Sequence, residues 1–148
     1  MSRAPRAAAG LVTAVLLVFA AIAGGAEPLR FVDLYEGSAP LGLKFSDTAT
    51  RLAGRPVVMR GFLAPPLKAE ATFFVLSSRP VSVCPFCQSD SDWPMDIVVV
   101  YPDTGASVFR SGSAQVEVSG RLELGSQRDP DTGFVSQVRL THATVRFI

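Results

Sequence analysis

From Arg55 to the end of the chain, apolar and polar side chains alternate with a period of two residues, which is the period of a β-strand with two unlike faces. The clearest example is the segment 115–124. One face carries Val116, Val118, Leu122 and Leu124, and the other carries Glu117, Ser119, Arg121 and Glu123. The other predicted strands are 56–63, 71–77, 96–101 and 134–148. The pattern therefore predicts an all-β domain with five main strands.

Two of these strands have a glycine in the middle, Gly61 and Gly120. Because glycine has no side chain, it lets a strand bend sharply at the corner of a barrel. We therefore predict a small five-stranded barrel of the OB type, with one short helix and an N-terminal arm. A β-sandwich is the alternative, since strand spacing alone does not separate the two folds.

One helix is expected before the strands. Ser46 can act as its N-cap, because the hydroxyl can accept a hydrogen bond from a free backbone N–H, and the helix would cover 47–52 and stop at Gly54. Residues 27–45 contain a single apolar cluster, F-V-D-L-Y, and are expected to form an ordered arm across the domain. The barrel domain itself would then be 46–148.

The first 26 residues have the three-part layout of a secretory signal peptide. The segment 1–6 carries two arginines and no acid, the segment 7–23 is apolar apart from Gly10 and Thr13, and small residues follow. We expect cleavage after Ala26 and a periplasmic mature protein. The alternative is an uncleaved anchor in the inner membrane, because the apolar run is close to the shortest length that spans a bilayer.

Export also sets the charge and size of the mature chain. Loss of 26 residues, with Arg3 and Arg6 among them, leaves 122 residues with 12 basic and 13 acidic side chains. This balance argues against a nucleic-acid surface. A chain of this length can bury a core of its own, so it needs no framework of disulfides. The sequence has no recognisable catalytic triad, phosphate-binding glycine loop or carboxylate pair, so an enzyme is not favoured and no cofactor is expected.

Both cysteines and the only tryptophan lie in one stretch, V-C-P-F-C-Q-S-D-S-D-W-P-M-D, at 83–96. A tight turn at Pro85 would bring Cys84 and Cys87 within disulfide reach. In an oxidising compartment such a pair is expected to be bonded. A four-residue loop makes this bond worth only about 2 kcal/mol, so it would shape the loop rather than hold the fold.

Two other interpretations of the cysteine pair stay open. A thiol–disulfide redox site needs a stabilised thiolate, whereas Asp90 and Asp92 would raise the pKa of a neighbouring thiol. A zinc site could combine Cys84 and Cys87 with Asp90, Asp92 or His142, the only histidine. Zinc is the one cofactor that this alternative would require.

The same loop offers apolar surface. Phe86 and Trp93 are candidate ligand contacts, because OB barrels often bind through such loops, and the alternative is that Trp93 closes an open barrel end. The arginines on predicted strands are expected on solvated faces; they are Arg60, Arg121, Arg139 and Arg146.

The succession L-A-G-R-P-V-V-M-R-G-F-L-A-P-P, T-F-F-V-L, a cysteine-bearing loop, D-I-V-V-V-Y and V-E-V-S-G-R-L-E-L resembles a family of small uncharacterised exported bacterial proteins with OB-like architecture. The resemblance covers about 45–148. Members are often encoded beside ABC-type transporter components linked to metal uptake, and their loop commonly has one cysteine near a histidine, where this chain has C-P-F-C. The resemblance implies a periplasmic binding or accessory module with membrane transporter components as partners and with an unidentified ligand.

Overall fold

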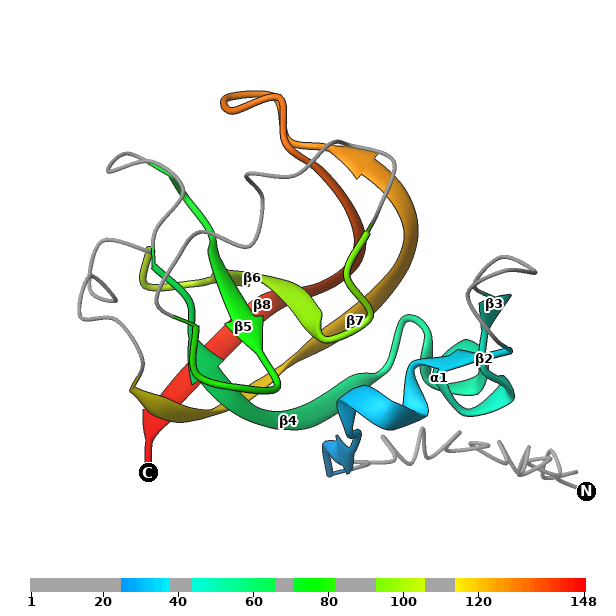
Figure 1. Ribbon diagram of the computed structural model, residues 1–148. Helices are drawn as coiled ribbons and strands as arrows, with labels where there is room; N and C mark the ends of the chain where they lie inside the picture. The colour runs from blue at the N-terminus through cyan, green and yellow to red at the C-terminus, as the bar shows by residue number, and fades with distance from the viewer. Residues whose placement is uncertain (1–24, 38–43, 66–70, 82–92, 106–113) are drawn as a thin grey trace, which may run out of the picture.

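Five strands joined in a ring dominate the structure. The computed structural model describes residues 25–37, 44–65, 71–81, 93–105 and 114–148. The main strands are β4 (Pro56–Leu63), β5 (Phe74–Ser77), β6 (Ile97–Pro102), β7 (Gln115–Arg128) and β8 (Val135–Phe147). Together with β1 (Glu27–Pro28), they form a six-stranded mixed sheet in the order β1-β4-β5-β6-β8-β7. Because β4 also pairs with β7, the hydrogen bonds run in a closed ring from β4 to β8 (Figure 1).

The ring contains one parallel contact. The strands pair antiparallel between β4 and β5, β5 and β6, β7 and β8, and β4 and β7, whereas β6 and β8 run parallel. In the β4–β7 ladder, Pro56 lies opposite Arg121 and Phe62 lies opposite Gln115. Strand β4 therefore makes a long ladder with β7 and a short ladder with β5.

Both central glycines stand where strands approach closely. A Cβ atom on Gly61 would lie 2.6 Å from the carbonyl oxygen of Ser77 on β5. A Cβ on Gly120 would lie 3.1 Å from the Cβ of Leu140 on β8. The missing side chains therefore let neighbouring strands close onto β4 and β7.

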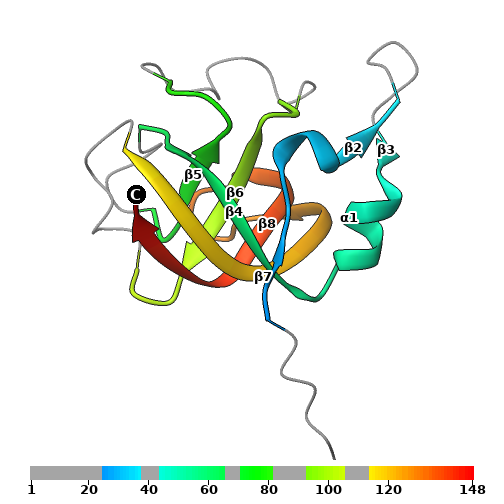
Figure 2. The same cartoon turned by 90° about the horizontal axis from the view of Figure 1, so that it is seen from below.

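The N-terminal elements lie together on one side of the ring in both views (Figures 1 and 2). They are β1, the 3-10 helix η1 (Phe31–Asp33), β2 (Tyr35–Glu36), β3 (Lys44–Phe45) and α1 (Asp47–Leu52). The predicted helix is confirmed: the Ser46 hydroxyl accepts a 3.0 Å hydrogen bond from Ala49 N, and Gly54 follows at φ +76°. Within the described ranges, no helix has the length and apolar character needed to cross a membrane.

Two apolar clusters lie on opposite faces of β5 and β6. The inner cluster fills the ring and contains Phe74, Leu76, Val98 and Val100 together with the predicted inward face of β7. The outer cluster contains the alternate residues of the same strands, Val75, Ile97 and Val99, together with Phe73 directly before β5. Both faces of β5 and β6 are therefore buried, which matches their unbroken apolar runs.

The strand bounds differ from the prediction mainly at two places. The structure starts β5 at Phe74 rather than at residue 71. It extends β7 to Arg128, past the predicted end at Leu124. The β7–β8 register shifts between Leu124 and Gln127, where Gly125 has φ +100°, so the strand passes through a bulge and then continues.

Candidate functional site

Most of the predicted site residues lie outside the described residues. Cys84, Phe86, Cys87, Asp90 and Asp92 all fall in 82–92. The disulfide, the redox site and the zinc site therefore stay predictions. From Trp93 the chain leads into β6.

Trp93 belongs to a line of four aromatic side chains on the outer face of β5 and β6, which we call the aromatic row. The indole packs on Phe134, with 6.3 Å between ring centroids. Phe134 stacks on Phe73 at 5.6 Å, and Phe73 contacts Tyr101 at 5.4 Å. The sequence analysis singled out Trp93 but not its three companions: Phe73 and Tyr101 were assigned only as parts of apolar strands, and Phe134 only as the start of the last predicted strand.

A buried polar contact lies at the Trp93 end of the aromatic row. Burial raises the pKa of Tyr35 to about 12, and the neighbouring Trp93 indole offsets part of that rise. Although the two groups are close, Trp93 Nε1 and Tyr35 Oη are both buried, and neither has a well-formed hydrogen bond to another described residue. An unsatisfied buried donor costs about 1 to 3 kcal/mol. An acceptor offered by a bound molecule or by water would remove that cost.

A second polar group lies at the Tyr101 end. The Tyr101 hydroxyl donates to Asp129 Oδ2 at 3.1 Å, and Thr132 donates to Asp129 Oδ1 from both its backbone N, at 2.8 Å, and its hydroxyl, at 2.7 Å. Burial by itself would raise the pKa of Asp129, but these hydrogen bonds outweigh it and lower the pKa. Burial first, and then the Asp129 charge, raise the pKa of Tyr101 to about 12. The carboxylate thus fixes the predicted 128–133 turn onto β6.

Arg139 corrects one expectation from the sequence. Arg60, Arg121 and Arg146 are exposed as predicted, but only 5 % of the Arg139 side chain is exposed. Arg139 lies opposite Val99 in the β6–β8 ladder, beneath the outer cluster. Its Nη1 donates to the carbonyl oxygens of Gly125, at 2.7 Å, and Ser136, at 3.1 Å. The two-residue period was right, but the outward face of β8 is covered at this point.

His142 is an exposed residue in a bulged part of β8. Its φ is +49°, 79 % of its side chain is exposed, and its Nδ1 lies 3.3 Å from Asp103 Oδ1. It borders a shallow hollow of about 320 Å³ that also contacts Ser119 and Arg121. Among the residues that can be described, no three histidine, cysteine or acidic side chains are grouped as metal ligands.

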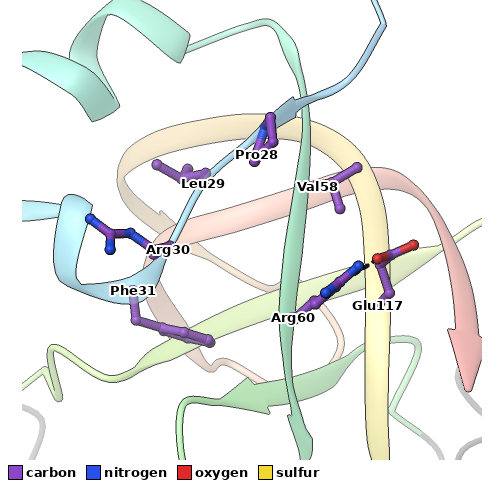
Figure 3. Close-up of a pocket in the computed structure, with 7 residues that line it drawn as sticks. All are labelled: Pro28, Leu29, Arg30, Phe31, Val58, Arg60 and Glu117. Atoms are coloured by element: carbon purple, nitrogen blue, oxygen red, sulfur yellow. Dashed lines mark hydrogen bonds and ion pairs between the residues drawn. The ribbon is translucent and has the colours of Figure 1, made fainter. Parts of the chain in front are cut away.

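A groove separates the N-terminal segment from the outward faces of β4 and β7, and we call it the arm groove (Figure 3). Its volume is about 350 Å³. The lining residues are Pro28, Leu29, Arg30 and Phe31 from the N-terminal segment, Val58 and Arg60 from β4, and Glu117 from β7. The sequence did not indicate this groove, because its walls come from three separate segments.

The fold defines a small, mainly β protein with one short helix, a closed ring of strand pairing and an aromatic cluster on the outer side of β5 and β6. It is structurally similar to a DUF3299 family protein (PA4066) from Pseudomonas aeruginosa PAO1, with a TM-score of 0.48 and 17% sequence identity over 84% of this chain and 97% of that chain. No family model matches the sequence. No curated protein matches it either.

Proposed function

We propose that this chain is an exported, periplasmic binding module built on an OB-type barrel, and that it serves as an accessory to an ABC-type transport system. The aromatic row is its proposed contact surface. The signal-peptide layout of the first 26 residues supports export, and the family resemblance supports the link to a transporter.

The ring of strand pairing supports the barrel. Five strands pair in a closed circuit with a single parallel contact, and glycines occupy two places where strands approach closely. In an OB barrel, ligands bind on the face of the second and third strands and on the loops that follow the first and fourth. Counted from β4, these are β5, β6, the connection between β4 and β5, and the turn between β7 and β8.

The position of the aromatic row is the observation that carries the proposal. Tyr101 lies on β6, Phe73 comes directly before β5, and Phe134 follows the β7–β8 turn. The row therefore coincides with the part of an OB barrel that binds partners. Trp93 adds a large, half-buried ring, and tryptophan is among the side chains that contribute most to binding energy at interfaces.

The test uses tagged protein in cells that make it naturally. Fractionation and mass spectrometry should find a mature N-terminus near Glu27 in the periplasm. Mild solubilisation of the membranes should recover transporter components with the wild-type protein. We expect Trp93→Ala to reduce that recovery at least about tenfold, which corresponds to a loss of about 1.4 kcal/mol.

The control is Val32→Ala, because Val32 is also apolar, is 75% exposed and lies in η1 rather than in the aromatic row. This variant should keep full recovery. A full-length species held in the inner membrane would contradict export. Equal recovery with the two variants would contradict the role of the aromatic row.

A further inference from the structure

We infer that the arm groove binds a small amphipathic monocarboxylate, and this inference does not rest on the function proposed for the aromatic row. The groove's volume of about 350 Å³ falls within the range of small-molecule sites, roughly 300 to 1,000 Å³. Such sites combine a mostly apolar lining with a few polar groups that fix the orientation of the ligand. The arm groove has both parts.

The apolar part is held in place by the fold. Leu29 N donates to Val58 O at 2.9 Å, which continues the short parallel ladder between β1 and β4. An ion pair of 2.8 Å between Arg51 and Glu27 also ties the start of the segment to α1. The half-buried Phe31 ring points into the gap between η1 and β4 (Figure 3). An apolar ligand body would therefore meet a preformed surface.

The charged part is a guanidinium with unused donors. Arg60 donates from Nε to Glu117 Oε2 at 2.8 Å, and within the described residues its two Nη groups have no hydrogen-bond partner. The Arg60 side chain is 67% exposed, so these groups can be reached from solvent. A guanidinium edge with two nitrogens matches the two oxygens of a carboxylate.

The local charge favours one negative charge on the ligand. Arg146 donates to Glu117 Oε1 at 2.7 Å, so two guanidinium groups share a single carboxylate. Hydrogen bonds from Arg146, and then from Arg60, lower the pKa of Glu117, which keeps it ionised near neutral pH. The cluster thus has one positive charge in excess, and a monoanion would balance it.

The other arginine at the groove does not extend the anion site. Arg30 donates through both Nε and Nη2 to the carboxylate of Asp33, at 2.8 Å in each case. In Figure 3 its side chain points away from Arg60. The groove therefore offers one anion-binding group, Arg60, with the apolar Val58 beside it on β4 and Phe31 on the side of the N-terminal segment (Figure 3).

The test is an NMR titration of the exported protein, in which amide signals are followed as octanoate, octanamide or inorganic phosphate is added. Octanoate should shift the signals of Phe31, Val58 and Arg60 saturably. Octanamide has the same chain without the charge, and phosphate has charge without the chain. Both should bind at least about tenfold more weakly, because a charge-assisted hydrogen bond and apolar burial each contribute more than about 1.4 kcal/mol.

Arg60→Gln should weaken octanoate binding at least about tenfold, and Arg60→Lys should give an intermediate loss, since it keeps the charge without the two-nitrogen edge. Glu117 keeps Arg146 as its partner in both variants, and unchanged signals elsewhere in the spectrum will show that the fold persists. The control is Arg79→Gln, which removes another exposed arginine, one that pairs with Asp96 among the described residues. Arg79→Gln should bind octanoate like the wild type.

Three results would overturn the inference. The first is no saturable shift at the arm groove, and the second is equal affinity for octanoate and octanamide, or for octanoate and phosphate. The third is the same octanoate affinity in Arg60→Gln as in the wild type.

Discussion

At the scale of single residues, two buried charges under the aromatic row, Arg139 and Asp129, are held by neighbours both near and distant in the sequence. Arg139 reaches backbone oxygens at Gly125 and Ser136, and its Nε lies 3.4 Å from Glu123 Oε2. Asp129 is buried, and its carboxylate accepts hydrogen bonds from Thr132 in its own turn and from Tyr101 on β6. Residue type alone would have placed both charges in solvent.

We expect Arg139→Ala to lower the free energy of unfolding by about 2 to 3 kcal/mol, because it leaves buried carbonyl oxygens without their donor. Arg121→Ala is the matched control on the neighbouring strand. Arg121 is exposed, and its side chain donates to Gly54 O at 2.9 Å, so its loss should cost under about 0.5 kcal/mol. Urea denaturation measures both, and equal costs would show that the burial of Arg139 has no energetic role.

Asp129 should make the protein sensitive to acid. Its folded pKa is lowered below the ordinary value of 3.8, so it contributes stability above that pH and loses this contribution as the pH falls through the folded pKa. Asp129→Asn should cost about 1 to 3 kcal/mol at pH 7 and should flatten the fall in stability below about pH 4. The control is Asp131→Asn in the same turn, at an exposed side chain. A wild-type acid profile in Asp129→Asn would refute the assignment.

Cys84 and Cys87 are predicted to form a disulfide that shapes their loop. Alkylation of the protein isolated from its native cells under native conditions should leave both unmodified until a reductant is added. Reduction should cost about 2 kcal/mol or less and leave the domain folded. Thiols that become reactive only after a chelator is added would instead indicate a metal site, which His142→Ala should weaken if the histidine is a ligand.

At the scale of elements, local signals predicted the helix and the strands well. Ser46 and Gly54 fix the ends of α1, and the strand 56–63 was predicted with the bounds that β4 has. The end of β7 was missed because Gly125 resembles a loop residue, although it forms a bulge inside a continuing strand. The two-residue period shows which side chains of a strand share a face. It does not show whether the polar face is covered by other residues, as it is at Arg139 on β8, because that depends on tertiary packing.

Gly61 provides a test of the close contact between β4 and β5. A methyl group at Gly61 would stand 2.6 Å from a backbone oxygen, so Gly61→Ala should force the strands apart and cost about 1 to 3 kcal/mol. Gly54→Ala is the comparison, since open space surrounds Gly54 and only its φ of +76° is unfavourable for alanine. It should cost about 1 kcal/mol. An additional shift of β5 amide signals is expected in Gly61→Ala alone, and its absence would contradict the close approach.

At the scale of the whole molecule, the candidate surfaces join segments that the sequence keeps far apart. The aromatic row brings Trp93 against Phe134, and the arm groove brings Arg60 against Glu117. Sequence patterns identified Trp93 and the strand positions of the arginines. They could not give the contacts, because each contact depends on the register between strands and on the path of the segment before them.

Site-specific photo-crosslinking in the native cell tests the proposed binding module most directly. Met95 is 43% exposed and lies two residues after Trp93, whereas Val32 is 75% exposed in η1. With a photoreactive amino acid at one position or the other, we predict a periplasmic adduct of defined mass, containing a transporter component, from position 95 and not from position 32. No adduct at position 95, or the same adducts at both positions, would contradict the claim that this protein binds its partner through the aromatic row.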